Sequence, residues 1–487
     1  MKLLSPDTQE QRSLEKFLPF LIIFSVWAIA RSYVYYYNWP YFLEDNADYS
    51  SFYMWYLPTD IIQHRFLDSM VYLRGEPPLP QFILGLLMKG FGWPFLIPVD
   101  SFFLSALTLL TAWMMYAVLV RYHFLPALST ILAAAWCMYP ANLSVEVYAF
   151  PTALYEALPS FIFVLSLWLC LRCFSNPRMS NIWLFGLAGA MLSMSRSTLS
   201  WIFILPLLIS FLLPGNKARI LAGCLAIIFQ LLWSLKNYSV YGQFHLETSS
   251  DVGQNIFSAV LNTGHINGFL EYSKQKNPND TFTLYGIPCL LAYDEKCLKQ
   301  QLPDVQHLDD ALREKLPSKE PLYGETYYQH ALSQKVKPLY ADYLLHNPIA
   351  ALNILRQSYL LFWGDIYWRI GYIKGLDTDS VILGVNAAFE KYKWLNILGI
   401  HLIGIPVFLF IVYCVLRGKT NNQRVAFLYA FLGYVYVATI SSLGEYTENT
   451  RYRVDVEALV WLLPFMAWRC MRSAFLQRTL AQSPLDQ

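Results

Sequence analysis

The chain has 487 residues, of which 56% are hydrophobic, 17% aromatic and only 14% charged. This balance is typical of an integral membrane protein and excludes a string of ordinary soluble domains. The formal net charge of +2 is too small for a nucleic-acid binder. Membrane lipid is therefore an expected partner, and nucleic acid is not.

Apolar runs of roughly 20 residues recur along the chain, and a helix of that length crosses about 30 Å of hydrocarbon. We therefore predict an all-α polytopic membrane protein, a single bundle of about ten transmembrane helices. The N-terminal tail leads into an apolar run without a small-residue cleavage site, which indicates an uncleaved first span. The expected spans are 17–37, 99–120, 124–140, 151–172, 182–195, 200–214, 219–236, 391–416, 425–443 and 454–472.

Arginine and lysine gather in alternate connections between these spans, as the positive-inside rule requires of cytoplasmic loops. Both termini are then cytoplasmic, and a bacterial inner membrane is the expected location. The basic positions are Arg121, Arg172, Arg178, Lys217, Arg219, Arg417, Lys419, Arg424, Arg469, Arg472 and Arg478.

The opposite, outer side receives three polar regions, namely 38–98, 237–390 and 444–454. We predict an N-terminal transmembrane module over 1–236, a small periplasmic cap over 237–390, and C-terminal transmembrane helices over 391–487. A short cap helix is expected around Lys335 to Leu345.

Two apolar runs on the outer side are unlike the predicted spans. Proline and glycine interrupt residues 79–95, and Arg356 lies in the middle of 348–363. Both are expected as interfacial or re-entrant helices rather than crossings.

The eight cysteines give little evidence of a metal or redox site. Cys170 and Cys173 have C-x-x-C spacing but lack the second ligand pair of a zinc site. Cys289 and Cys297 lie together in a polar outer segment, where an oxidising compartment allows a local disulfide.

An acidic cluster follows the first span, formed by Glu44, Asp45 and Asp48. Carboxylates beside a membrane are costly to bury, so such a cluster is expected either in contact with solvent or in a functional site. A carboxylate at this depth can act as a general base on an attacking hydroxyl. The alternative is a solvated acidic connection, which composition alone favours.

A motif downstream of this cluster favours the catalytic interpretation over the solvated connection. Tyr72-Leu-Arg-Gly-Glu-Pro-Pro-Leu79 leads into an apolar helix that ends in Lys89-Gly-Phe-Gly92. With the acidic loop, this pattern resembles the GT-C superfamily of polyprenyl-phosphate-sugar glycosyltransferases, in particular the group of glycosyltransferase family 39, lipid A aminoarabinose transferases and protein O-mannosyltransferases. Similar matches follow in order at Pro140 with Glu156, Gly186 with Gly189 and Arg196-Ser-Thr, Lys236-Asn-Tyr238, Gly242-Gln-Phe244, Thr248-Ser-Ser250, Gly253-Gln-Asn255 and Arg451-Tyr-Arg453.

The resemblance implies a GT-C-type helical bundle with an active site on the outer face. It implies transfer of one sugar from a polyprenyl-phosphate donor to an acceptor hydroxyl on a glycan, lipid or protein, with inversion at the anomeric carbon. Asp45 matches the catalytic aspartate of the motif, and Asp48 matches the second acidic position. Contacts to the acceptor or sugar are expected from Glu44, Tyr49, Glu76, Glu156 and Glu445.

A departing polyprenyl phosphate requires positive charge, because negative charge grows on its oxygen as the glycosidic bond breaks. The candidates on the outer face are Arg74, Arg196, Lys236, Arg451 and Arg453. The alternative for each is a snorkelling side chain that anchors a helix end. Glu76 departs from the family pattern, in which many members carry His or Lys before the Pro-Pro pair.

Two questions stay open at this stage. A divalent cation can be shared by Asp45, Asp48 and the donor phosphate, yet no ligand spacing requires one, and no metal site is predicted. A lipid-linked oligosaccharide ligase or polymerase and, with less support, a secondary transporter remain alternative functions.

Overall fold

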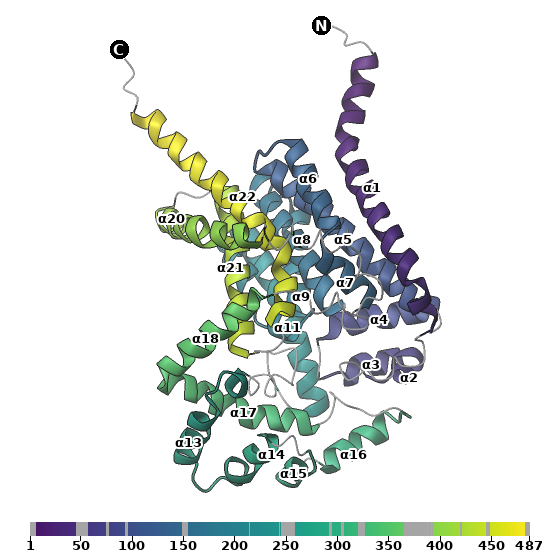
Figure 1. Cartoon of the computed structure of the whole chain (residues 1–487), viewed down its shortest axis with the longest axis vertical. Coiled ribbons are helices and arrows are strands. Elements are labelled where there is room, and N and C mark those ends of the chain that lie inside the picture. Colours follow the sequence, from purple (N-terminus) through teal and green to yellow (C-terminus); the bar gives the residue numbers. More distant parts are fainter. Residues whose placement is uncertain are drawn as a thin grey trace.

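The computed structural model of the chain (Figure 1) describes residues 6–44, 57–74, 77–92, 96–148, 154–213, 215–242, 244, 259–291, 295–302, 306–319, 327–364, 387, 391, 393–418, 421–444 and 449–482. Every regular element within these ranges is a helix. The predicted all-α membrane class is therefore confirmed for this part of the chain.

Six helices in the described ranges are long and apolar enough to cross a membrane. Their apolar parts are Phe17–Tyr36 of α1 (Pro6–Glu44), Pro98–Arg121 of α5 (Leu96–Arg121), α8 (Leu154–Ser175), α11 (Asn216–Tyr241), Lys393–Leu416 with η7 (Gly399–Gly404) and α20 (Ile405–Leu416), and α21 (Asn422–Gly444).

The other four predicted spans correspond to helices that do not meet these criteria of length and apolar composition. Two of them are the shorter apolar helices α9 (Met179–Ser193) and the 197–210 segment with η3 (Ser197–Leu199) and α10 (Ile204–Ser210). Another is the 12-residue α6 (Pro126–Cys137), which is followed by α7 (Pro140–Tyr148). The last lies within α22 (Asn449–Gln482), whose apolar run contains charged residues.

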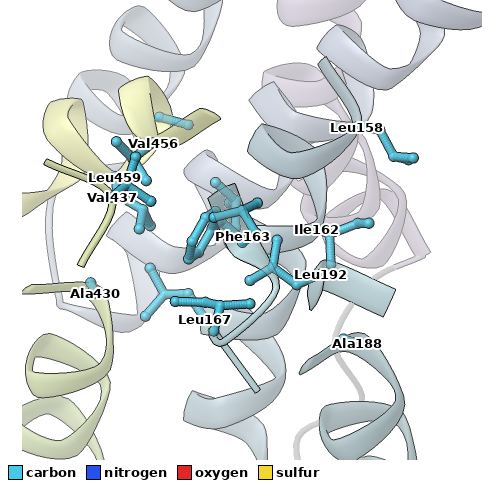
Figure 2. Close-up of a cluster of buried hydrophobic side chains, with 14 of the residues drawn as sticks. Leu158, Ile162, Phe163, Leu167, Ala188, Leu192, Ala430, Val437, Val456 and Leu459 are labelled. Atoms are coloured by element: carbon cyan, nitrogen blue, oxygen red, sulfur yellow. The ribbon is translucent and has the colours of Figure 1, made fainter. Parts of the chain in front are cut away.

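Helix α8 lies at the centre of the bundle, in contact with α5, α9, α21 and α22. Figure 2 shows Phe163 and Leu167 of α8 meeting Leu459 of α22 and Val437 of α21. Because lipid tails are as apolar as these side chains, close packing rather than removal from water holds such helices together.

Two helices of the bundle approach each other closely through a glycine. A Cβ on Gly186 of α9 would lie 2.8 Å from the carbonyl oxygen of Ala222 in α11. Small residues at such a crossing let two backbones come together and increase van der Waals contact. By contrast, only 22% of the α1 span is buried, so most of that helix faces outward.

The two interrupted apolar runs form helices too short to cross a bilayer. They are α4 (Pro78–Phe91, 14 residues) and α18 (Pro348–Phe362, 15 residues). At about 1.5 Å per residue each extends only about 20 Å. This length agrees with the predicted interfacial placement.

The segment between α11 and α18 has a small core of its own, built around Phe269, Phe282, Val336, Tyr340 and Tyr343. It contains the predicted disulfide between Cys289 and Cys297. Its helices are α13 (Ile266–Lys276), η4 (Phe282–Gly286), α14 (Ile287–Leu291), α15 (Glu295–Gln300), α16 (Gln306–Lys315) and α17 (Tyr327–His346).

This cap lies at one end of the bundle, whereas α1 begins and α22 ends at the other (Figure 1). The Tyr340 hydroxyl donates a hydrogen bond of 2.7 Å to the carbonyl of Leu443 at the end of α21. The helix expected around Lys335 to Leu345 is confirmed as part of α17.

Candidate functional site

The acidic loop itself lies outside the described residues. Helix α1 ends at Glu44, whose side chain is likewise not described. The predicted site residues to which this applies are Glu44, Asp45, Asp48, Tyr49, Glu76, Glu445 and, for its side chain, Arg451. Their roles stay predictions.

Short contacts join the turn before α4 to the cap-side ends of α9 and α11. The backbone N–H of Leu79 donates to the carbonyl of Met194 at 3.0 Å, which connects the start of α4 to the end of α9. The Lys236 ammonium of α11 donates to the carbonyl of Leu73 at 2.5 Å. The turn that resembles the glycosyltransferase motif is thus held between α9 and α11.

Two predicted phosphate-binding residues lie in this junction. Arg74 is fully buried, with its guanidinium carbon 5.3 Å from the centre of the Tyr241 ring. The Lys236 ammonium lies 3.4 Å from the centre of the Trp233 ring. Aromatic faces attract cations and keep these charges close to the helix ends.

An apolar groove opens next to these cations, between α3 (Phe66–Tyr72), α4, α9 and α11. Phe82 and Leu232 are 42% and 54% exposed, so the groove opens on the side of the bundle. Trp233 forms part of its wall and also packs against Lys236. The lining consists of Met70, Pro78, Leu79, Phe82, Met191, Met194, Phe229, Leu232 and Trp233.

A third predicted phosphate ligand, Arg196, already has a carboxylate partner. Its guanidinium lies 2.7 Å from Asp455 of α22 and donates to the carbonyl of Tyr155 at 3.1 Å. Its carbon also lies 4.3 Å from the centre of the Tyr452 ring. Glu156, the next residue after Tyr155, is fully buried in the first turn of α8.

The fourth, Arg453, is paired in the same way. Its Nε donates to the carboxylate of Glu457 at 2.9 Å, and Nη1 donates to the carbonyl of Gly364 at 3.1 Å. The Tyr139 hydroxyl donates to the other oxygen of Glu457 at 3.0 Å. Buried charges need such partners because removal from water is costly.

The structure therefore brings four predicted cations to the cap-side end of the bundle but gives them different surroundings. Lys236 packs against Trp233 of the apolar groove and donates to a backbone carbonyl, and Arg74 lies against the ring of Tyr241. Arg196 and Arg453 form buried ion pairs with Asp455 and Glu457, two residues that sequence reasoning did not single out. Carboxylates inside an apolar run were the signal that could have found them.

A third buried ion pair lies deeper in the bundle and was not predicted. Arg31 of α1 forms an ion pair of 2.5 Å with Glu146 of α7 and also donates to the carbonyl of Cys137. The hydroxyl of Thr108 donates to the same carboxylate at 2.7 Å. This network attaches the outward-facing α1, which leads into the acidic loop, to the rest of the bundle.

Among the side chains that the structure describes, no group of three or more His, Cys, Asp or Glu residues is arranged to hold a metal ion. Asp45 and Asp48 fall outside that part of the chain, so a divalent cation shared by them is not tested.

No protein-family model matches the chain, and no curated protein matches it either.

Proposed function

We propose that the chain is an inverting glycosyltransferase that moves one sugar from a polyprenyl-phosphate donor to an acceptor hydroxyl at the cap-side end of the bundle. The observation that carries this proposal is the apolar groove whose wall residue Trp233 packs against Lys236, with Lys236 and Arg74 both beside the ring of Tyr241. An amphiphile with a hydrocarbon chain and a phosphate head fits this combination.

The chemistry begins with the donor in the groove. The first isoprene units of the donor lie against Leu232 and Phe82, and its phosphate lies toward Lys236 and Arg74. Asp45 takes the proton of the acceptor hydroxyl as that oxygen attacks the anomeric carbon from the face opposite the phosphate. The bond between the anomeric carbon and the phosphate oxygen breaks with its electron pair, and polyprenyl phosphate leaves.

Cations near the leaving oxygen lower the barrier because they stabilise charge that develops only in the transition state. Lys236 and Arg74 suit this role, since Lys236 packs against Trp233 in the wall of the groove and Arg74 lies against the ring of Tyr241 on the same helix. Arg196 and Arg453 act from the same end by fixing α22. The ion pair of Arg196 with Asp455 joins α22 to the segment after α9, and hydrogen bonds from Arg453 to the carbonyls of Phe362 and Gly364 join α22 to the end of α18. Asp48, Tyr49, Glu44, Glu76, Glu156 and Glu445 remain proposed contacts to the acceptor or sugar, and Arg451 to the donor phosphate.

The proposed location is a bacterial inner membrane with the cap in the periplasm. The disulfide between Cys289 and Cys297 supports this orientation, because disulfides persist in oxidising compartments. The acceptor is a glycan, a lipid or a protein, and mass spectrometry of surface glycans from a deletion strain would identify both acceptor and sugar.

The test of the base is Asp45→Asn, with Asp68→Asn as the matched control. Asp68 is an exposed residue of α3 whose partner is Arg65. We expect Asp45→Asn to lower sugar transfer by at least about 10²-fold at unchanged membrane insertion, and the control to transfer normally. Unchanged transfer by Asp45→Asn would remove Asp45 as the base.

The test of the groove is Leu232→Trp, with Leu231→Trp as its control. Leu232 lines the groove, and the neighbouring Leu231 does not, although it is 39% exposed. Filling the groove is expected to raise the KM for the donor by about tenfold or more, as loss of apolar contact does in binding pockets. Equal KM values in the two variants would place the donor chain elsewhere.

A further inference from the structure

At the end of the bundle opposite the cap, the described basic side chains have no described carboxylate as an ion-pair partner. Elsewhere in the described chain, Arg31, Arg196 and Arg453 each form an ion pair with a buried carboxylate. At the opposite end, none of the following cations forms an ion pair with a described carboxylate: Arg121, Arg172, Arg178, Lys217, Arg219, Arg417, Arg469 and Arg472.

The sequence explains this asymmetry. The connections 121–126, 172–179, 213–219 and 417–424 contain no Asp or Glu. The N-terminal residues 1–16 contain three acidic and three basic residues and so contribute no net charge. The C-terminal residues 473–487 contain one basic and one acidic residue, Arg478 and Asp486. The four connections therefore carry a net positive charge that anions outside the chain can balance.

Two of these cations come together. Arg121 ends α5 and Arg172 lies in the last turn of α8, and the two helices pack side by side. Arg121 donates a hydrogen bond to Ser175, which ends α8 in the same turn that contains Arg172. Like charges at one helix end repel each other, and an anion bound between them relieves that repulsion.

The neighbours of this pair are neutral and suited to a lipid headgroup. Ser175 accepts hydrogen bonds from Arg121 at 3.3 Å and from Asn422 at 2.9 Å. The Arg172 guanidinium carbon lies 4.4 Å from the centre of the Trp168 ring, one turn toward the middle of the span. Tryptophan is common at the level of lipid headgroups, where its ring contacts both acyl chain and interface.

We propose that Arg121 and Arg172, together with Ser175 and Asn422, form a binding site for the phosphate of an anionic phospholipid in the leaflet at this end of the bundle. The planar guanidinium groups bind phosphate oxygens in pairs. The acyl chains then begin beside Trp168, a partly buried residue at the edge of the core. This site is separate from the cap-side groove and does not depend on the proposed function.

The test uses the full-length protein and native mass spectrometry of bound lipid, with phosphatidylglycerol and phosphatidylcholine as probes. The variant is Arg121→Gln/Arg172→Gln. The control is Arg178→Gln/Lys217→Gln, which removes the same charge from the same end. Wild type and control are expected to retain phosphatidylglycerol over phosphatidylcholine. The variant is expected to lose about 30-fold in apparent affinity, since each cation at an anionic surface contributes about fivefold.

Equal losses in the two double variants would overturn the site and leave only diffuse attraction. Release of the lipid by millimolar inorganic phosphate would indicate a site for free phosphate instead. If the glutamine variant does not fold, the wild-type protein still tests the proposal through its preference between the two lipids. Equal retention of phosphatidylglycerol and phosphatidylcholine would contradict the proposal. The charge-preserving Arg121→Lys/Arg172→Lys variant is then expected to retain phosphatidylglycerol with intermediate affinity.

Discussion

The guanidinium of Arg196 lies 2.7 Å from the carboxylate of Asp455, although the two residues are 259 positions apart in the sequence. Both side chains are almost completely buried, with exposed fractions of 5% and 0%. The pair joins the segment after α9 to the beginning of α22, next to the proposed reaction site.

Removal of one partner of this pair is expected to destabilise the protein strongly. Arg196→Met and Asp455→Asn should each lower the free energy of unfolding by about 3–5 kcal/mol, because the remaining charged or polar group stays buried without its partner. The double variant Arg196→Met/Asp455→Leu should recover most of this loss. Denaturant unfolding in detergent measures all three. A single Arg196→Met variant of full stability that cannot bind donor would instead assign Arg196 to the donor phosphate.

The composition of the chain was sufficient to predict its class and the position of its long apolar helices. The spans over α1, α5, α8, α11 and α21 follow from uninterrupted apolar runs, which sequence shows directly. The disulfide was one of the possibilities that the sequence allowed, because Cys289 and Cys297 are close in sequence within a polar segment. Local features of this kind need no tertiary information.

The partners of the buried charges could not be predicted in the same way. Asp455 and Glu457 lie inside an apolar run that was assigned to the predicted last span, and their partners come from distant helices or the preceding turn. The apolar groove likewise has walls from four helices. Only packing brings these residues together, so the predicted cations could be named from sequence but their surroundings could not.

Lys236 should contribute to catalysis through its charge. Lys236→Gln keeps a donor for the carbonyl of Leu73 but removes the cation beside the groove. Under the proposed function, kcat should fall by about 10²-fold, because the charge acts on the leaving phosphate in the transition state. Steady-state transfer assays with a synthetic polyprenyl-phosphate sugar measure this.

Lys236→Arg is the matched control, and it should keep most of the activity because it keeps the charge. If Lys236→Gln and Lys236→Arg lose activity equally while both remain folded, the shape of the side chain rather than its charge is responsible.

Two helical glycines should respond to alanine with opposite signs. Gly186→Ala places a methyl group 2.7 Å from Cβ of Leu225 and 2.8 Å from the carbonyl oxygen of Ala222. Because backbone must move, a loss of about 1–3 kcal/mol is expected. Gly90 in α4 has no atom within 4 Å of the same position, so Gly90→Ala should gain about 0.5–1 kcal/mol through helix propensity. Thermal unfolding of the two variants tests this, and a gain in stability for Gly186→Ala would contradict close packing of α9 on α11.

The cap contains a group of side chains whose ionisation should make its stability depend on pH. The Tyr272 hydroxyl donates a hydrogen bond of 2.6 Å to Asp342, which also faces Lys276 and His346. This bond to the carboxylate raises the pKa of Tyr272 to about 12 and, with the ammonium of Lys276, lowers the pKa of Asp342.

The two shifts act at opposite ends of the pH scale. Since the pKa of Tyr272 is raised on folding, its contribution is complete below the unfolded value near 10 and is lost as the pH rises toward about 12. Since the pKa of Asp342 is lowered, its contribution is present above about 4 and is lost as the pH falls through the lower folded value.

The measurement is the difference in melting temperature between wild type and Tyr272→Phe across this range. That difference should be constant from about pH 5 to 9 and shrink above about pH 10, because only wild type then loses the hydrogen bond. Tyr285→Phe, which changes an exposed tyrosine of the same cap, should show no such change relative to wild type. A wild-type advantage over Tyr272→Phe that persists unchanged at alkaline pH would mean that the hydrogen bond to Asp342 does not stabilise the cap.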